Sequence, residues 1–352
     1  MKAWVLHDKG DIRYEDIDIP LLSDGEVRVR VKACGICGSD IPRIYDTGAH
    51  NMPIVIGHEF SGIVEGIGRN ADMSWLGKRV GLYPLIPCGR CNQCNKGRFE
   101  MCRDYDYLGS RRNGGFAEYV AVPASNLINI PDGISFEEAA MLEPMAVAVH
   151  AMRRGIGFAE GVIHREDTIA LCGLGTIGLL LADFLIEAGY SNLYLIGNSD
   201  YQRETMVKAG ISEDRYCDSR RQDPAAWLME KTGGVRLYFE CAGHMESLSY
   251  GIDSTAPVGR IMIIGNPQTD MRLSRDTYWK ILRNQLILTG TWNSSFTCSE
   301  DDDWHYVVNR LQNHSIHPTA HITHKFGLET MDEGLSVMRD KDIYHCKVMI
   351  YM

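Results

Sequence analysis

A glycine-rich turn in the middle of the chain restricts the fold more than any other feature of the sequence. The turn, 173–178, follows an apolar run, Thr168 to Cys172, and opens a second apolar stretch, Gly178 to Ala188, that is typical of a helix. Between a strand and a helix, a GxGxxG pattern indicates dinucleotide binding, because the glycines allow a tight turn, close approach of the pyrophosphate and close helix packing. The alternative is a glycine turn without a ligand. The candidate cofactor-binding residues here are Gly173, Gly175, Thr176, Ile177 and Gly178.

The sequence around this turn alternates between strands and helices. Such a rhythm predicts an α/β fold with a doubly wound parallel sheet. The expected strands are 167–171, 192–196, 237–240, 260–264 and 286–289, and the expected helices include 178–188 and 203–209. The first 130 residues instead predict short strands, at 26–31, 61–67, 79–83 and 116–122. A capping box at Ser135-Phe136-Glu137-Glu138 starts the helical part, and the tail predicts helices at 303–313 and 330–339 and a strand at 347–351.

Size and charge exclude several classes of protein. A chain of 352 residues predicts about two domains. Its formal charge of −10, without a run of five or more Lys and Arg, argues against nucleic acid as a partner. No apolar stretch reaches the roughly 20 residues that a membrane span requires, and the first residues contain no signal peptide. We therefore expect a cytoplasmic protein with neither nucleic-acid nor membrane partners.

Four cysteines lie close together, in the spacing C-x2-C-x2-C-x7-C. Four thiolates at such a spacing, in a reducing compartment, predict a closed tetrahedral zinc site. An iron–sulfur cluster also uses four thiolates and remains an alternative. The candidate ligands are Cys88, Cys91, Cys94 and Cys102.

A second set of metal ligands lies earlier in the chain. Cys37 is followed by Gly38-Ser39-Asp40, and His58 and Glu59 follow Gly57. One thiolate, one imidazole and one carboxylate make a zinc site with an open position. Taken separately, each of these residues is more often a surface or core side chain than a ligand.

The expected second strand of the parallel sheet ends without an acid. An NAD site usually carries Asp or Glu there to bind the adenosine ribose, but this strand ends in Gly197-Asn198-Ser199-Asp200. Gly197, Asn198 and Ser199, helped by Arg203, therefore favour NADP, whose 2′-phosphate a carboxylate would repel. Asp200 keeps NAD as the alternative.

Several motifs together resemble the zinc-dependent medium-chain alcohol and polyol dehydrogenases. They are Cys37-Gly38-Ser39-Asp40, Gly57-His58-Glu59, the four-cysteine loop, Gly114-Gly115-Phe116-Ala117-Glu118-Tyr119, Glu143-Pro144 and the turn 173–178. The segments 42–44, 48–50 and 105–112 resemble, more narrowly, the galactitol-1-phosphate 5-dehydrogenases of this family. The turn 197–201 is instead similar to that of NADPH-using ribulose-5-phosphate reductases.

This resemblance implies a GroES-like β-rich catalytic domain, residues 1–150 and 291–352, and a Rossmann domain, residues 151–290. It implies two zinc ions per chain, one structural and one catalytic, with Cys37, His58 and Glu143 as catalytic ligands and Glu59 as a ligand or an outer residue. Ser39 is the implied proton relay. His50 either passes the proton onward from Ser39 or is an ordinary surface histidine. A homo-oligomer, dimer or tetramer, is also implied.

Three arginines are candidates for binding a substrate phosphate. A chain of negative charge needs local cations to bind a sugar alcohol phosphate. Arg43, Arg111 and Arg112 are the candidates, with Arg43 and Arg112 ranked first. We expect hydride transfer between NAD(P) and a secondary alcohol of such a phosphate. The alternatives are an unphosphorylated polyol or L-threonine as substrate, or an NADPH-dependent reduction of a ketose 5-phosphate.

Overall fold

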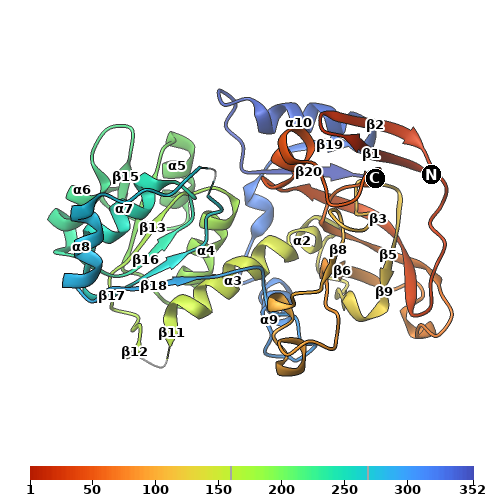
Figure 1. Ribbon diagram of the computed structural model, residues 1–352, viewed down its shortest axis with the longest axis horizontal. Coiled ribbons are helices and arrows are strands. Elements are labelled where there is room, and N and C mark those ends of the chain that lie inside the picture. Colours follow the sequence, from red (N-terminus) through yellow and green to blue (C-terminus); the bar gives the residue numbers. More distant parts are fainter. Residues whose placement is uncertain (159–160, 268) are drawn as a thin grey trace. The chain divides into compact units, whose positions relative to one another are not determined.

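The computed structural model describes residues 1–158, 161–267 and 269–352 (Figure 1). Contacts between residues divide the chain into two units. Unit 1 consists of Met1–Ala146 and Ser294–Met352, and unit 2 is Val147–Asn293. Unit 2 is thus inserted between two segments of unit 1. No helix in the described ranges combines the length and the apolar character needed to cross a membrane.

Unit 2 is built around a parallel sheet. Its six strands have the order β15-β14-β13-β16-β17-β18 in the part of the chain that the structure describes. The strands are β13 (Ile169–Cys172), β14 (Leu193–Gly197), β15 (Tyr216–Asp218), β16 (Val235–Glu240), β17 (Thr255–Ile263) and β18 (Ile287–Gly290). All neighbouring pairs are parallel, which confirms the doubly wound sheet predicted from the sequence. The strand order reverses between β13 and β16, the place where such sheets bind ligands.

Helices cover this sheet on both faces. They are α4 (Thr176–Glu187), α5 (Asp200–Lys208), α6 (Pro224–Thr232), α7 (Met245–Ser254) and α8 (Arg275–Arg283). α7 contacts both α6 and α8, and Figure 1 shows α4 on the other side of the sheet. The strands between the two helical layers are apolar because they are buried on both faces; all four residues of β13 are buried.

Unit 1 is dominated by a mostly antiparallel sheet. Its order is β10-β6-β5-β3-β20-β19, and β9 also pairs with β3. The strands are β3 (Glu26–Ile36), β5 (Glu59–Ile67), β6 (Arg79–Leu82), β9 (Tyr119–Pro123), β10 (Leu127–Asn129), β19 (Ile322–Gly327) and β20 (Lys347–Tyr351). In β3 the predicted alternation is confirmed, since Val27, Val29 and Val31 are buried whereas Arg30 is exposed. β20 pairs antiparallel with β3, so the segment after unit 2 completes the sheet begun before it.

Some elements differ from the sequence-based expectation. The capping box is confirmed: the Glu138 backbone donates to Ser135 Oγ at 3.1 Å and the Ser135 backbone to Glu138 Oε2 at 2.7 Å, at the start of α2 (Phe136–Ala140). The strand expected at 116–122 begins only at Tyr119. Before it, the Phe116 backbone donates to Ile56 at 3.0 Å rather than to a strand. The N-terminal hairpin β1 (Lys2–Asp8) and β2 (Asp11–Asp16) was not predicted.

Candidate active site

The four-cysteine loop runs between two short paired strands, β7 (Leu85–Ile86) and β8 (Asp106–Tyr107). Its sulfur atoms lie close together: Cys91 Sγ is 3.5 Å from Cys94 Sγ and 3.9 Å from Cys102 Sγ, and Cys88 Sγ is 3.9 Å from Cys94 Sγ. Ligands about 2.3 Å from a tetrahedral zinc are about 3.8 Å apart. The cluster therefore fits one metal ion and leaves no room for a multi-atom iron–sulfur cluster.

Hydrogen bonds from the backbone stabilise thiolates in this loop. The Cys94 amide donates to Cys91 Sγ at 3.5 Å and lowers the pKa of Cys91 to about 6. The Cys88 amide donates to Cys102 Sγ at 3.3 Å. Burial instead raises the pKa of Cys94 to about 12 and also raises that of Cys102. Since zinc binds thiolates and not thiols, metal binding at neutral pH would release protons from these two buried cysteines.

The second candidate metal site forms where strand ends meet. Cys37 follows β3 directly and His58 precedes β5, and these strands pair antiparallel with Gly35 opposite Glu59. This register brings residues that are distant in the sequence to one end of the sheet. One ligand atom from each of Cys37, His58 and Glu59 lies within 4.8 Å of the others. We call these three residues the Cys–His–Glu cluster.

Asp40 positions the histidine of this cluster. Its carboxylate is fully buried, and Asp40 Oδ1 lies 3.3 Å from His58 Nδ1. Oδ2 accepts a hydrogen bond from the Cys37 backbone at 3.0 Å. Burial alone would raise the pKa of Asp40, but His58 and Arg43 lower it. Nδ1 makes no hydrogen bond of good geometry to a described residue, so Asp40 attracts the ring by charge and turns Nδ1 toward itself, which leaves Nε2 for a metal.

Lys347, the first residue of β20, was not predicted as part of the site. Its ammonium donates to Glu59 Oε2 and, at 3.2 Å, to the carbonyl oxygen of Ile36. The residue is only 2% exposed. Burial would lower the pKa of Lys347, but the Glu59 carboxylate raises it above its usual value. The sequence contained one signal, a lysine at the start of an otherwise apolar strand, but its partner is distant in the chain.

Replacing Lys347 by methionine should destabilise the metal-free protein by about 3–5 kcal/mol, because it leaves the Glu59 carboxylate buried without a counter-charge. Urea unfolding measures this. The matched control is Lys325→Met, since Lys325 lies 3.7 Å from Glu137 with its side chain 56% exposed, and exposed pairs contribute about 1 kcal/mol or less. Adding Glu59→Gln to Lys347→Met should restore part of the loss. If Lys347→Met and Lys325→Met lowered the free energy of unfolding equally, the buried ion pair between Lys347 and Glu59 would be contradicted.

The other expected catalytic residues lie around the cluster. Ser39 Oγ donates to Cys37 Sγ at 3.2 Å. Glu143, in α3 (Leu142–Ile156), is 8% exposed and is not among the three residues of the cluster. Burial raises the pKa of Glu143 to about 7, against the attraction of His58. A buried carboxyl of this kind is ready to accept a cation.

The three candidate phosphate-binding arginines have different partners. Arg43 Nη1 contacts Asp40 Oδ1 at 2.6 Å, and Arg112 Nη2 contacts Glu26 Oε1. Both guanidinium groups therefore already neutralise buried carboxylates. Arg111 instead packs on the ring of Tyr105, 4.4 Å from its centroid.

Arg111 has no carboxylate partner among the described residues. Its Nη2 lies 3.5 Å from Nε2 of the exposed His50, and its Nε is buried without a hydrogen-bond partner. No described contact joins His50 to Ser39. Arg111 and Arg112 line a cavity of about 380 Å³ whose lining includes none of the Cys–His–Glu cluster. Aromatic contacts nevertheless connect Arg111 to the cluster, from Tyr105 to Tyr107 at 6.3 Å and from Tyr107 to His58 at 5.8 Å.

The glycine-rich turn of unit 2 has the space that a dinucleotide needs. Gly173 has φ +95°, and a Cβ there would lie 2.6 Å from the Ala242 nitrogen. A Cβ on Gly178 would overlap the carbonyl oxygen of Gly173. At Gly175, the N-cap of α4, nothing lies within 4 Å of an added Cβ. Thr176 and Ile177 begin α4, so this helix end with its amide groups faces open space and fits a pyrophosphate.

In the turn at the end of β14, a side chain at position 197 would have to displace the ends of two neighbouring side chains. A Cβ on Gly197 would lie 2.5 Å from the Tyr216 hydroxyl and would clash with Gln202 Oε1. Gln202 also accepts from the Asn198 backbone at 2.9 Å and donates to the Leu174 carbonyl at 3.0 Å. It thus connects this turn to the glycine-rich turn, a role that the sequence did not reveal.

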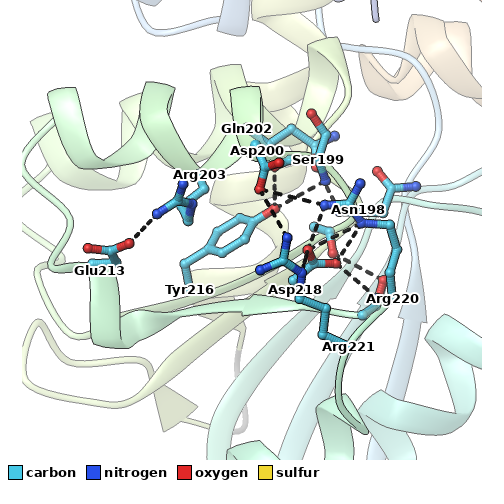
Figure 2. A network of polar contacts seen from close by, with 12 residues as sticks. Asn198, Ser199, Asp200, Gln202, Arg203, Glu213, Tyr216, Asp218, Arg220 and Arg221 are labelled. Carbon is cyan, nitrogen blue, oxygen red and sulfur yellow. Dashed lines mark hydrogen bonds and ion pairs between the residues drawn. The ribbon is translucent and has the colours of Figure 1, made fainter. Parts of the chain in front are cut away.

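Figure 2 shows the polar side chains around this turn. Tyr216 Oη donates to the Ser199 carbonyl at 2.8 Å. Arg203 pairs with Glu213. Arg220 and Arg221, which were not predicted, approach from the loop after β15.

Comparisons with known proteins agree with this geometry. Residues 23–132 match the alcohol dehydrogenase GroES-like domain, and residues 176–313 match the zinc-binding dehydrogenase family. Galactitol 1-phosphate 5-dehydrogenase of Escherichia coli K12 is 30% identical over 337 residues, 95% of each chain. The crystal structure of galactitol-1-phosphate dehydrogenase from E. coli superimposes with a TM-score of 0.89, at 29% identity over 100% of both chains.

Two further structures contain nicotinamide cofactors. The rspB alcohol dehydrogenase of E. coli CFT073, complexed with NADH, has a TM-score of 0.89 at 27% identity and covers 100% of this chain and 99% of its own. A zinc-binding dehydrogenase from Sinorhizobium meliloti 1021, bound to NADP, has a TM-score of 0.87 at 26% identity with the same coverage. The two cysteine-containing clusters fit zinc, and the turns of unit 2 fit NAD(P). The chain therefore belongs to the zinc-binding, medium-chain alcohol dehydrogenases.

Proposed function

We propose that this chain transfers hydride between NADP and a secondary alcohol of a sugar alcohol phosphate. The observation that carries the reaction type is the Cys–His–Glu cluster, with ligand atoms within 4.8 Å of one another, in a chain that also holds a dinucleotide-binding turn. The similarity to galactitol 1-phosphate 5-dehydrogenase supports the substrate class. The absence of an acid at Gly197, the end of β14, supports NADP.

Cys37 and His58, with a carboxylate of Glu59 or Glu143, would hold the catalytic zinc. Bound there, zinc would supply Lewis-acid chemistry toward the alcohol oxygen, and a bound nicotinamide would supply the hydride acceptor. Asp40, whose Oδ1 lies 3.3 Å from Nδ1, would orient His58 so that Nε2 can bind the metal. Ser39, whose hydroxyl is 3.2 Å from Cys37 Sγ, accepts the proton of the substrate hydroxyl and passes it to solvent. In the reverse direction the same residues support reduction of a ketose phosphate.

We assign the phosphate to Arg111. Arg43 and Arg112 were the first candidates from the sequence. Arg43 pairs with the buried Asp40 and Arg112 with the buried Glu26, so both are less available to an incoming anion. Arg111 keeps a buried Nε without a partner, and its only described side-chain hydrogen-bond contact is with the exposed His50, an uncharged partner that an anion can displace. Because Arg43 and Arg112 are already paired with carboxylates, fewer cations remain for a phosphate. This observation favours the alternative substrate, an unphosphorylated polyol.

Replacing Arg111 by alanine should raise KM for polyol phosphates about 10- to 150-fold, the value of one charge-assisted hydrogen bond, and leave KM for free polyols unchanged. The measurement is kcat/KM for a panel of polyols and their phosphates, each with NAD and NADP. Arg69→Ala serves as control, because Arg69 pairs with Asp24 with its side chain 80% exposed. Equal kcat/KM for phosphorylated and free polyols in the wild type would refute the proposed substrate class.

A further inference from the structure

The loop after β15 brings two arginines to the start of α5. Arg220 Nη2 lies 2.6 Å from Asp218 Oδ2, and Arg221 Nε lies 3.3 Å from the same oxygen. Both guanidinium groups also reach Asp200 Oδ1, at 3.7 Å from Arg220 and 3.8 Å from Arg221. Figure 2 shows the two arginines between the two carboxylates. This arrangement of two arginines and two aspartates is separate from Arg203, which pairs with Glu213.

The two carboxylates are held very differently. Asp218 is 12% exposed in its side chain and also accepts the Arg220 backbone amide at 2.9 Å. Hydrogen bonds from Arg220 lower the pKa of Asp218, so it stays ionised and fixes the arginines. Asp200 is 57% exposed, and its contacts with the arginines are longer than hydrogen bonds. Asp218 neutralises one of the two guanidinium charges. The second charge is balanced only by the exposed Asp200, through contacts of 3.7 and 3.8 Å.

The cluster lies where the adenosine ribose of a dinucleotide is bound in this fold. β15 is the neighbour of β14, with Asp218 opposite Gly197 in the pairing of the two strands. A cavity of about 380 Å³ is lined by Asp200, Arg203, Glu213, Tyr216, Asp218, Arg221 and Gln222. Within this lining, Arg203 and Glu213 neutralise each other. In Rossmann domains the ribose hydroxyls lie at the end of the second strand, here Gly197. The cavity is therefore open to a group attached to the ribose.

We propose that Arg220 and Arg221 bind the 2′-phosphate of NADP, and that Asp200 occupies the place of this phosphate until the cofactor arrives. The inference rests on the NADP preference proposed above and names residues that the sequence did not suggest. A phosphate carries nearly two negative charges and three acceptor oxygens, so it competes well with one exposed carboxylate for two guanidinium groups. Because Asp218 already orders both arginines, the phosphate meets donors that are held in position.

The test uses nucleotide fragments that cannot accept hydride. Binding of 2′-phospho-ADP-ribose and of ADP-ribose to the full-length protein is measured by titration calorimetry. Arg220→Ala and Arg221→Ala should each weaken the phosphorylated ligand about 10- to 100-fold and change ADP-ribose less than about twofold. Asp200→Asn should tighten the phosphorylated ligand about two- to fivefold, since it removes a competitor.

Two controls separate the effect from general loss of charge or of structure. Arg272→Ala removes an arginine of unit 2 that is 82% exposed and pairs with Asp270, and it should bind both ligands as the wild type does. Arg220→Ala also removes the ion pair with Asp218. The unfolding temperature of this variant is therefore measured, to show whether its fold is intact. Arg221 is 72% exposed, and its replacement should leave that temperature unchanged.

The outcomes distinguish this inference from the proposed function. If the wild type prefers the phosphorylated ligand but both arginine variants keep that preference, the NADP assignment stands and the role of Arg220 and Arg221 is refuted. If the wild type prefers ADP-ribose, the proposed cofactor is wrong. If Asp200→Asn weakens ADP-ribose, Asp200 binds the ribose hydroxyls as in an NAD site, and the competitor role is refuted.

Discussion

Cys37→Ser is expected to abolish turnover, with kcat lowered about a thousandfold or more. Loss of a Lewis acid removes several kcal/mol of transition-state stabilisation, and about 4 kcal/mol corresponds to this factor. The fold should persist because Cys37 lies after the end of β3 and is partly exposed, outside the apolar core. Steady-state kinetics, metal content and the unfolding temperature are measured together.

Cys298→Ser is the matched control for this variant. Cys298 is exposed and belongs to neither metal-ligand group of the described residues. Its replacement should leave kcat and the zinc content as in the wild type. A Cys37→Ser protein with normal turnover, or one that retains zinc at both sites, would show that the Cys–His–Glu cluster is not the catalytic centre.

The second large effect concerns the four-cysteine loop. Cys94→Ser should reduce the zinc content from two ions per chain to one and destabilise unit 1 by roughly 5 kcal/mol, since loss of a metal site is among the few mechanisms with effects this large. Cys94 is only 7% exposed, so a serine there leaves a buried hydroxyl without a metal. Metal analysis and urea unfolding measure the two changes.

A neighbouring residue of the same loop provides the comparison. Asn92 is exposed and lies between two of the ligands, so Asn92→Ala should change neither the metal content nor the unfolding midpoint. Wild-type protein with one zinc per chain after full reconstitution, or with iron in the loop, would mean that one of the two sites is misassigned.

The sequence predicted those parts of the site whose signal is local. The turn 173–178 and the four-cysteine loop each contain, within one short segment, the residue types and spacing that the chemistry requires. The parallel sheet was predictable for the same reason, because each strand and each helix has its own periodic pattern.

What could not be predicted depends on pairing between distant segments. The partners of Arg43 and Arg112 decide whether these arginines are available, and Arg112 lies 86 positions from Glu26. Lys347 is 288 positions from Glu59, and only the register of β20 against β3 and of β3 against β5 joins them. Arg220 and Arg221 likewise become a pair around Asp200 only after β15 is placed beside β14.

The insertion of unit 2 into unit 1 sets an order for assembly during synthesis. β3 and β5 are made early, but β20, which binds the other edge of β3 and provides Lys347, is made only after all of unit 2. Until then only β9 covers this edge of β3, at residues 26–30, the part from Ala33 to Ile36 is open, and Glu59 lacks its buried counter-charge. The Cys–His–Glu cluster thus has its own three residues before unit 2 is made, but it receives its buried counter-charge only with the last strand of the chain.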